Sequence, residues 1–234
     1  MLLLDVTPLS LGIETMGGVV AKIIPRNSTV PASAQELFTT GVENQTGIDI
    51  HVLQGERELA KDCRSLARFK LKVPSGPAGL ARIEVKFLID ASGILQVSAK
   101  DLRAGTEHSI EVQPSYGLND AEVERMLEES IEFAEQDFSE RQMIEARNEA
   151  ESILGLTEKA LARERAEAPG ELPAEERRAV EAAMAALRES LSGTDYKRVR
   201  ALVDVLNQAS TPLAERMMNR ALATALEGKK LGEV

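Results

Sequence analysis

Few side chains in this sequence could carry out nucleophilic or metal chemistry. Its 234 residues include two histidines, His51 and His108, and one cysteine, Cys63. These three cannot supply the four ligands of a structural zinc site, so we expect no metal. Neither of the patterns G-x-x-x-x-G-K-[ST] and G-x-G-x-x-G, which bind nucleotide phosphates, occurs, and no nucleophile–base pair stands out. We therefore predict that this chain is not an enzyme.

His51 and Cys63 each have an ordinary structural interpretation. His51 lies in a run that alternates with period two, so its side chain points away from those of Ile50 and Val52. That position is typical of a structural or surface histidine. Cys63 fits a half-buried, inert thiol better than a reactive one.

Charge and cysteine content exclude several classes of function. Residues 1–117 carry a net charge of −1 and residues 118–234 a net charge of −9. An acidic surface repels phosphate backbones, so we expect no nucleic-acid partner. A single cysteine permits no internal disulfide, as in proteins of reducing compartments. Because no run approaches the roughly 18 apolar residues of a membrane span, we predict a cytoplasmic protein without a membrane partner.

The composition changes after residue 117. Residues 1–117 contain 11 of the 16 glycines and 6 of the 9 prolines, whereas residues 118–234 consist of long runs rich in Ala, Glu, Arg and Leu. Strands followed by helices indicate an α+β protein in two parts. We predict an antiparallel β-sandwich over residues 5–117 and an α-helical bundle over residues 118–234.

The strands are expected where apolar and polar residues alternate between turn signals. The clearest runs are residues 19–24, 48–52, 83–87, 94–99 and 109–112. Gly-Gly at 17–18, Asn-Gln-Thr-Gly at 44–47 and Asp-Ala-Ser-Gly at 90–93 are turn signals between them. Seven or eight short strands at this spacing are typical of a sandwich.

Four helices are expected after residue 118. The first begins at Asn119 or Asp120, a good N-cap, and ends before the Pro-Gly-Glu-Leu-Pro segment 169–173. A second helix follows this segment, a third begins near Asp195 and a fourth at residues 210–212. Two inward-facing stripes follow from the helical period. The stripe of the first helix is Leu127, Ile131, Ala134 and Phe138, and that of the fourth is Leu213, Met217 and Leu222.

Three stretches, residues 5–18, 44–57 and 87–101, are unusually specific when taken together. They resemble the substrate-binding region of the seventy-kilodalton heat-shock chaperone family (DnaK-like proteins). Residues 118–234 look like the helical lid of that family. Residues 58–69, 114–118 and 228–234 are most similar to its HscA-type branch, which serves iron–sulfur cluster assembly.

The resemblance implies a peptide-binding cleft. The positions that match the family's central hydrophobic pocket are Ile13, Phe38, Ile48, Ile50 and Ile83. Met16 matches one side of an arch over the peptide, and the other side falls at Gly41. Backbone groups near Glu14, Met16, Thr39 and Gly41, with the amide of Gln45, would hydrogen-bond an extended peptide. Taken without the resemblance, each apolar member fits a sandwich core better than a cleft.

Two departures from the family pattern concern the lid and the arch. Basic groups that help to latch the lid in DnaK-like proteins are replaced by Ala78 and Gly155, while acids stand at Glu43 and Glu151. We take these two acids as lid-latch candidates and expect a weaker or differently held lid. At Gly41 the arch lacks a side chain, so we expect it to close less tightly or to admit a bulkier peptide.

The resemblance also implies a nucleotide-regulated partner domain. Leu2, Leu3 and Leu4 resemble the end of the family's interdomain linker, so residues 1–4 are expected to be linker. The ATPase domain that precedes such a linker is expected to lie outside this chain. ATP is then a cofactor of the full-length protein and not of this chain, and a J-domain co-chaperone acts on the complete chaperone.

The function that these observations favour is that of a chaperone substrate-binding fragment. It captures a short extended peptide segment in a hydrophobic cleft under a helical lid, and the implied client is the iron–sulfur scaffold protein. A general holdase of the DnaK type is the alternative. A metal carrier acting through Cys63 is a weaker hypothesis, because one cysteine cannot fill a four-thiolate cluster site.

Overall fold

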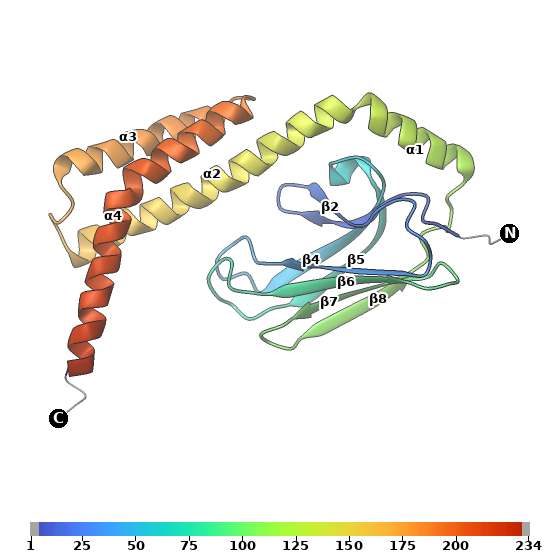
Figure 1. Cartoon of the computed structure of the whole chain (residues 1–234), viewed down its shortest axis with the longest axis horizontal. Coiled ribbons are helices and arrows are strands. Elements are labelled where there is room, and N and C mark those ends of the chain that lie inside the picture. The colour runs from blue at the N-terminus through green and yellow to red at the C-terminus, as the bar shows by residue number, and fades with distance from the viewer. Residues whose placement is uncertain (1–4, 231–234) are drawn as a thin grey trace. The chain divides into compact units, whose positions relative to one another are not determined.

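The computed structural model describes residues 5–230, so the proposed linker residues Leu2, Leu3 and Leu4 lie outside the described residues. Eight strands come first and four α-helices follow, which confirms the predicted α+β class (Figure 1). The strands are β1 (Leu11–Thr15), β2 (Val19–Ile24), β3 (Ala32–Phe38), β4 (Gly47–Gln54), β5 (Arg64–Lys72), β6 (Ile83–Ile89), β7 (Leu95–Asp101) and β8 (Glu107–Val112).

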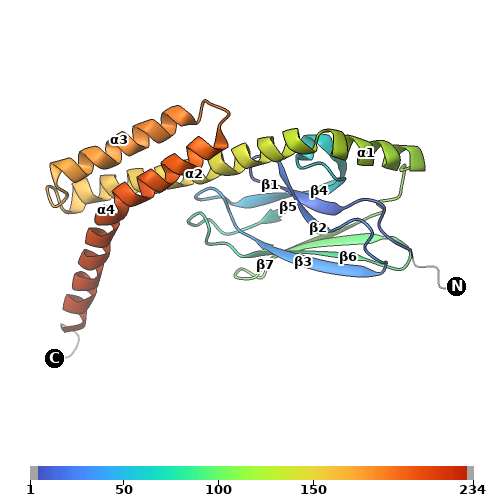
Figure 2. The ribbon, with the colours of Figure 1, turned by 45° about the horizontal axis from the view of Figure 1, so that its top comes forward.

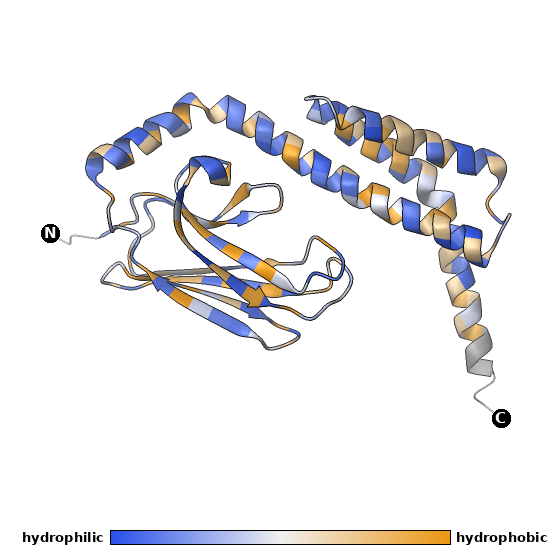
Figure 3. Ribbon diagram, turned by 180° about the vertical axis from the view of Figure 1, so that it is seen from behind, coloured by the Kyte–Doolittle hydropathy of each residue, from blue (hydrophilic) through white to orange (hydrophobic). Residues whose placement is uncertain are grey.

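The strands form two antiparallel sheets that lie one above the other (Figure 2). One sheet has the order β2-β1-β4-β5 and the other the order β3-β6-β7-β8. Apolar and polar residues alternate along the strands, as Figure 3 shows by colour, so each sheet turns one apolar face inward. The core between them includes Val52, Val85, Phe87 and Val97, all with 0% exposure.

Strand β5 was not among the clearest predicted strands. Its inward positions are filled by Ala67, Phe69 and Leu71, and the first of these is too small to give a strong hydrophobic signal. Charged residues occupy most of the outward positions of this strand. Pairing with β4 across eight residue pairs, including Ile50 with Phe69, supplies the order that the local sequence only weakly indicates.

Helix α1 (Asp120–Glu132) begins as expected at Asn119, whose side chain accepts the backbone N–H of Glu122 at 2.9 Å. Helix α2 (Ala134–Glu167) follows after a break at Phe133. The predicted stripe is wrong, because Ile131 is 78% and Phe138 55% exposed. A short 3-10 helix, η1 (Ala60–Asp62), precedes β5.

The chain forms two compact units, and the boundary between them falls between residues 141 and 142, inside α2. Helix α1 and the first turns of α2 therefore belong to the same unit as the sandwich. The second unit, Gln142–Val234, contains the rest of α2 with α3 (Ala174–Ser190) and α4 (Tyr196–Lys230). The predicted domain boundaries, 5–117 for the sandwich and 118–234 for the helices, follow the change from strand to helix. As boundaries of functional domains they stay a prediction.

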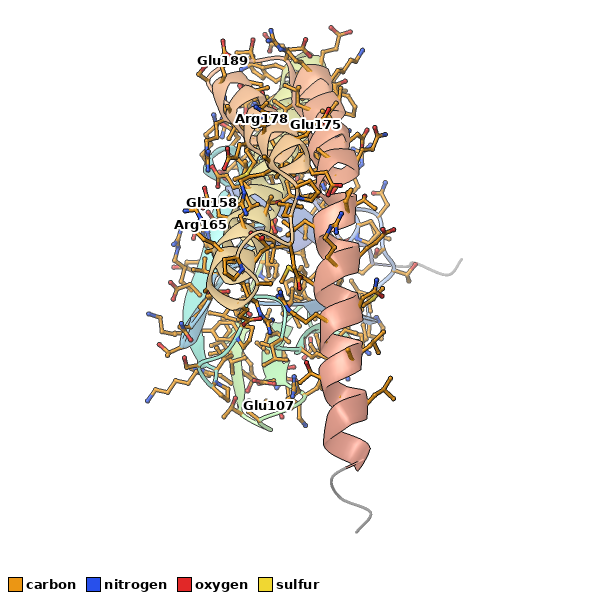
Figure 4. The ribbon with its side chains drawn as sticks, turned by 90° about the vertical axis from the view of Figure 1, so that its left-hand side faces the viewer. Glu107, Glu158, Arg165, Glu175, Arg178 and Glu189 are labelled. Atoms are coloured by element: carbon orange, nitrogen blue, oxygen red, sulfur yellow. The ribbon has the colours of Figure 1, made fainter. Side chains whose placement is uncertain are left out.

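The second unit packs its helices around Val180, Leu187, Val199 and Leu206, each with 0% exposure. Apart from Glu164, which is 2% exposed and paired with Arg177, the charged side chains that the structure describes lie at the surface of this unit. Those labelled in Figure 4 on α2 and α3 are Glu158, Arg165, Glu175, Arg178 and Glu189.

The third and fourth predicted helices are one helix, because α4 runs through Pro212. Proline lacks the N–H of a helical hydrogen bond, and the hydroxyls of Ser210 and Thr211 both donate to the carbonyl oxygen of Asn207 just before it. Leu213 is buried as predicted, but Leu222 is 55% exposed, so the predicted inward orientation of Leu222 is wrong.

None of the helices within residues 5–230 combines the length and the hydrophobicity of a membrane span.

Candidate functional site

A cleft of about 420 Å³ opens at one end of the sandwich. All ten residues assigned to peptide binding line this one cleft: Ile13, Glu14, Met16, Phe38, Thr39, Gly41, Gln45, Ile48, Ile50 and Ile83. They come from β1, β3, β4, β6 and the segments after β1 and β3. The structure therefore brings together residues that lie up to 70 positions apart in the sequence.

The cleft exists because neighbouring strands separate. Strand β1 pairs with β4 only from Leu11 to Ile13, opposite Gln54 to Val52. Beyond Ile13, β1 continues to pair with β2, and the first half of β4 continues to pair with β5. Backbone groups after Ile13 are thus left beside an open space, as strand addition by an extended peptide requires.

The floor of the cleft is apolar and continuous with the core. Ile13, Ile50 and Ile83 are 3%, 2% and 0% exposed, and they belong to the cluster that fills the sandwich. Phe38 and Ile48 are half-buried and pack against this cluster. These residues are therefore both core and cleft lining, so the two interpretations offered by the sequence are compatible.

Met16 and Gly41 meet at the rim. A Cβ atom built on Gly41 would lie 2.6 Å from Sδ of Met16, well inside van der Waals contact. The thioether of Met16, a side chain that is 48% exposed, thus occupies the space that a side chain at position 41 would need. The two sides of the predicted arch are complementary in size.

A hydrogen-bonded network stands beside the cleft. Nδ1 of His51 lies 2.6 Å from Oε2 of Glu14, and Nε2 lies 2.8 Å from Oγ of Ser65. Nη2 of Arg68 approaches the same Glu14 oxygen at 3.6 Å. His51 is 6% exposed, so it is a structural histidine and not a surface one. Both of its ring nitrogens are occupied by protein groups.

The amide of Gln45 has a partner within its own loop, because Nε2 donates to the carbonyl oxygen of Gly47 at 2.9 Å. The remaining acceptor of the amide, Oε1, is the group that the peptide-binding prediction would use. That prediction stays a prediction for this residue.

Six lining residues were missing from the prediction: Thr15, Val42, Gly47, Asp49, His51 and Arg68. All but Arg68 adjoin a predicted member in the sequence, so counting the neighbours of each predicted residue would have found them. Arg68 lies on β5 directly opposite His51. The weak hydrophobic signal of β5 hid this residue.

The lid-latch candidates fall in different compact units. Glu43 lies between β3 and β4 in the first unit, and Glu151 lies on α2 in the second. Their suggested role as remnants of an ionic latch stays a prediction.

A second cluster of polar residues, which we call the charged joint, fixes the start of α2 to the sandwich. Its members are Arg57, Glu58 and Lys61 before β5, and Asp137, Glu140 and Arg141 on α2. The distances from Arg57 Nε and Nη2 to the two Asp137 oxygens are 2.6 and 2.8 Å. The Phe133 ring lies 4.5 Å from the guanidinium. This geometry is bidentate and largely buried.

Charges in the joint shift the pKa values of its acids. The hydrogen bond from Arg57 is the main cause that lowers the pKa of Asp137, against the opposing effect of burial. Burial raises the pKa of Glu58, but hydrogen bonds from Arg141 and Lys22 outweigh it and the pKa is lowered. Both carboxylates are therefore stabilised in their charged forms.

Cys63 is half-buried beside the joint, as predicted. Burial raises its pKa to about 11, and Sγ donates to the carbonyl oxygen of Arg57 at 3.5 Å. A thiol with so high a pKa carries little thiolate at neutral pH and is a poor nucleophile or metal ligand.

The structure thus combines a β-sandwich, with a cleft at the point where two strands separate, and a helical unit that follows it in the sequence. The family model described as "Hsp70 protein" matches residues 1–219. This chain belongs to the Hsp70 family.

Within that family, the chain is similar to proteins described as "Chaperone protein HscA homolog". It is 50% identical to those of Cupriavidus necator and Ralstonia nicotianae over the whole chain, and 49% identical to that of an Azoarcus species over 99% of it. The chain spans 37% of the length of each of these relatives. These matches confirm the resemblance to the HscA-type branch.

The prediction that this chain is not an enzyme, with the ATPase domain outside it, is corrected by these matches. The Hsp70 match covers residues 1–219, and the relatives are chaperones of a family that uses ATP. The missing patterns exclude only nucleotide sites built on those two loops. ATPase activity is therefore not excluded from this chain.

Proposed function

We propose that this chain captures a short extended peptide segment of a client protein in the cleft between β1 and β4. The observation that carries the proposal is the separation of these strands after Ile13, above a floor of Ile13, Ile50 and Ile83. An extended peptide there gains backbone hydrogen bonds, and its apolar side chains bury against the floor. Membership of a chaperone family supports the same function.

The size of the cleft suits transient binding. Two buried leucine-sized side chains contribute about 1.5–3 kcal/mol each, and five hydrogen bonds contribute about 1 kcal/mol each. Association and ordering cost at least about 4 kcal/mol of this sum. The remaining 4–7 kcal/mol or so corresponds to a Kd between about ten micromolar and one millimolar. Such weak binding permits release on the time scale that a chaperone needs.

For the whole protein we propose regulation by ATP, with nucleotide state shifting the cleft between open and closed populations. A J-domain co-chaperone would act on that cycle. Its client would be the iron–sulfur scaffold protein, by resemblance to the HscA-type branch, and its location the cytoplasm. A general holdase with broad preference for apolar peptides is the second candidate, favoured by the apolar floor of the cleft.

Fluorescence anisotropy with labelled peptides tests the proposal and separates the two candidates. A Pro-containing segment of the scaffold protein is compared with a generic Leu-rich chaperone peptide. Binding of the scaffold segment alone supports a specialised clamp, and equal binding of both supports the general holdase. Failure of both peptides to bind would contradict peptide capture itself.

A further inference from the structure

A second cavity, of about 200 Å³, lies beside the cleft where three loops of the sandwich meet. These are the segment after β3, the β5–β6 loop and the β7–β8 turn. Gln45 lies on the wall of both cavities. Along the segment after β3 the lining alternates, because Thr39 and Gly41 border the cleft while Thr40 borders the second cavity.

A buried carboxylate lines this second cavity. Asp101 is 1% exposed, and its Oδ1 accepts the backbone N–H groups of Arg103 at 2.8 Å and Ala104 at 3.2 Å. Within residues 5–230, no hydrogen bond or ion pair reaches its Oδ2. Buried carboxylates ordinarily have partners, because an uncompensated buried charge is costly. Oδ2 is therefore an acceptor that the cavity offers to a ligand.

The arginine of the same turn does not neutralise this carboxylate. Nη1 of Arg103 donates instead to the carbonyl oxygen of Leu80, at 3.3 Å, and in the described part of the chain it forms no ion pair with Asp101. The other walls of the cavity are partly aliphatic, with Pro74, Pro77, Leu80 and Ala81, and partly polar, with Thr40, Gln45 and Ser75.

We propose that the second cavity binds a primary ammonium group carried on a short aliphatic chain. The ammonium donates to Oδ2 of Asp101, and the methylene groups pack against the aliphatic walls. A compact ammonium suits a single free acceptor better than a planar guanidinium, which favours two. Since a cavity of about 150 Å³ accommodates benzene, a four-carbon chain fits here. The ammonium comes from a lysine side chain of a segment in the cleft or from a free alkylamine.

An NMR titration with n-butylammonium tests the site without relying on peptide binding. The backbone amides of Arg103 and Ala104, which bond to Asp101, report on the carboxylate. We expect saturable shifts of these amides in the wild type. The Asp101→Asn variant, which keeps the acceptor for both amides, should bind at least about tenfold more weakly because a charged partner is lost. n-Butanol, which has the same chain without the charge, should bind the wild type as weakly as n-butylammonium binds Asp101→Asn.

Asp90→Asn is the matched control. Oδ1 of Asp90 accepts the N–H groups of Ser92 and Ile94 in the β6–β7 turn, so this aspartate has the same turn role but lines neither cavity. It should leave the amine titration unchanged. Equal amine binding by wild type and Asp101→Asn, or no saturable shift together with no lysine preference, would overturn the proposal.

A pair of Leu-rich peptides that differ only in lysine or norleucine identifies the source of the ammonium. This arm rests on the proposed peptide capture. A preference for the lysine peptide in wild type that disappears in Asp101→Asn assigns the cavity to the client segment. Saturable amine binding without a lysine preference assigns it to a free alkylamine. If neither peptide binds, peptide capture fails while the amine titration still decides the cavity.

Discussion

The cleft and the charged joint belong to the same compact unit but are built from opposite kinds of side chain. The cleft is an opening between strands whose floor of isoleucines is shared with the core. The charged joint is a set of ion pairs, of which Arg57 with Asp137 is the most buried. An apolar floor accepts many partners of suitable size, whereas a bidentate ion pair accepts one geometry. In the proposed function the cleft provides adaptable binding, and the joint attaches the first turns of α2 to the sandwich.

The largest effect is expected from breaking the buried pair of the joint. Arg57→Ala leaves Asp137, with a side chain only 3% exposed, as an uncompensated charge. Loss of one partner of a buried pair costs about 3–5 kcal/mol, so amide hydrogen exchange at the start of α2 should accelerate by at least about a hundredfold.

Lys61→Ala is the control for this change. It removes an exposed ion pair of the same joint, Lys61 with Glu140, and should change stability by less than about 1 kcal/mol. Equal exchange rates in the two variants would show that the buried pair does not hold the helix.

The joint should also weaken in acid. Because the pKa of Asp137 is lowered in the folded protein, chiefly by Arg57, its contribution is complete above the unfolded pKa, near 4. It is lost as the pH falls through the lower folded pKa. Protection factors at the start of α2, which compare each exchange rate with that of an unfolded peptide at the same pH, should therefore fall below about pH 4, less steeply in Asp137→Asn. A slope unchanged by this substitution would assign the acid sensitivity to other carboxylates.

In the cleft we expect a smaller effect, which is measured on peptide binding. Ile48→Ala trims a half-buried side chain of the floor, and should weaken a Leu-rich peptide by about tenfold in an anisotropy titration. Leu37→Ala is the control, because Leu37 is 58% exposed on β3 and does not line the cleft. Comparable losses in both variants would place peptide binding elsewhere.

At the rim of the cleft, we expect the Met16 side chain to move when a side chain is introduced at Gly41. In Gly41→Ala the new methyl group must displace Sδ of Met16, which lies at the flexible end of its side chain. We expect Gly41→Ala to change the peptide affinity by a few fold in the wild type. In a protein that already carries Met16→Ala, the same substitution should leave the affinity unchanged. A double-mutant cycle measures this coupling. Additive effects would show that the two residues do not form one arch.

The smallest effect is expected at Cys63. With a pKa raised to about 11 by burial, the thiol should react with iodoacetamide far more slowly at pH 8 than a free cysteine. Mass spectrometry of the alkylated protein follows the reaction. Rapid labelling under native conditions would reveal an accessible thiolate and revive the metal-carrier hypothesis.

The same contrast explains which features could be predicted from the sequence. Alternation with period two locates most strands, and the family resemblance names ten residues that line the cleft. The joint was missed because its helix buries Asp137 and exposes Phe138, the reverse of what hydrophobicity predicts. Partners that are distant in the sequence, the Arg57 guanidinium and the backbone N–H of Glu58, make that orientation favourable. Pro212 was read as a helix start because proline is typical of the first turn of a helix, whereas α4 continues through it.

Photo-crosslinking tests the central claim, peptide capture in the cleft, most directly. A Leu-rich peptide with benzoylphenylalanine in place of one leucine is irradiated with the protein, and the crosslinked residues are identified by mass spectrometry. We predict crosslinks concentrated at Met16 and Ile48, which decrease in Ile48→Ala and with excess unlabelled peptide. Crosslinks spread over the outer faces of the sheets or over α3 and α4, insensitive to both, would contradict the account.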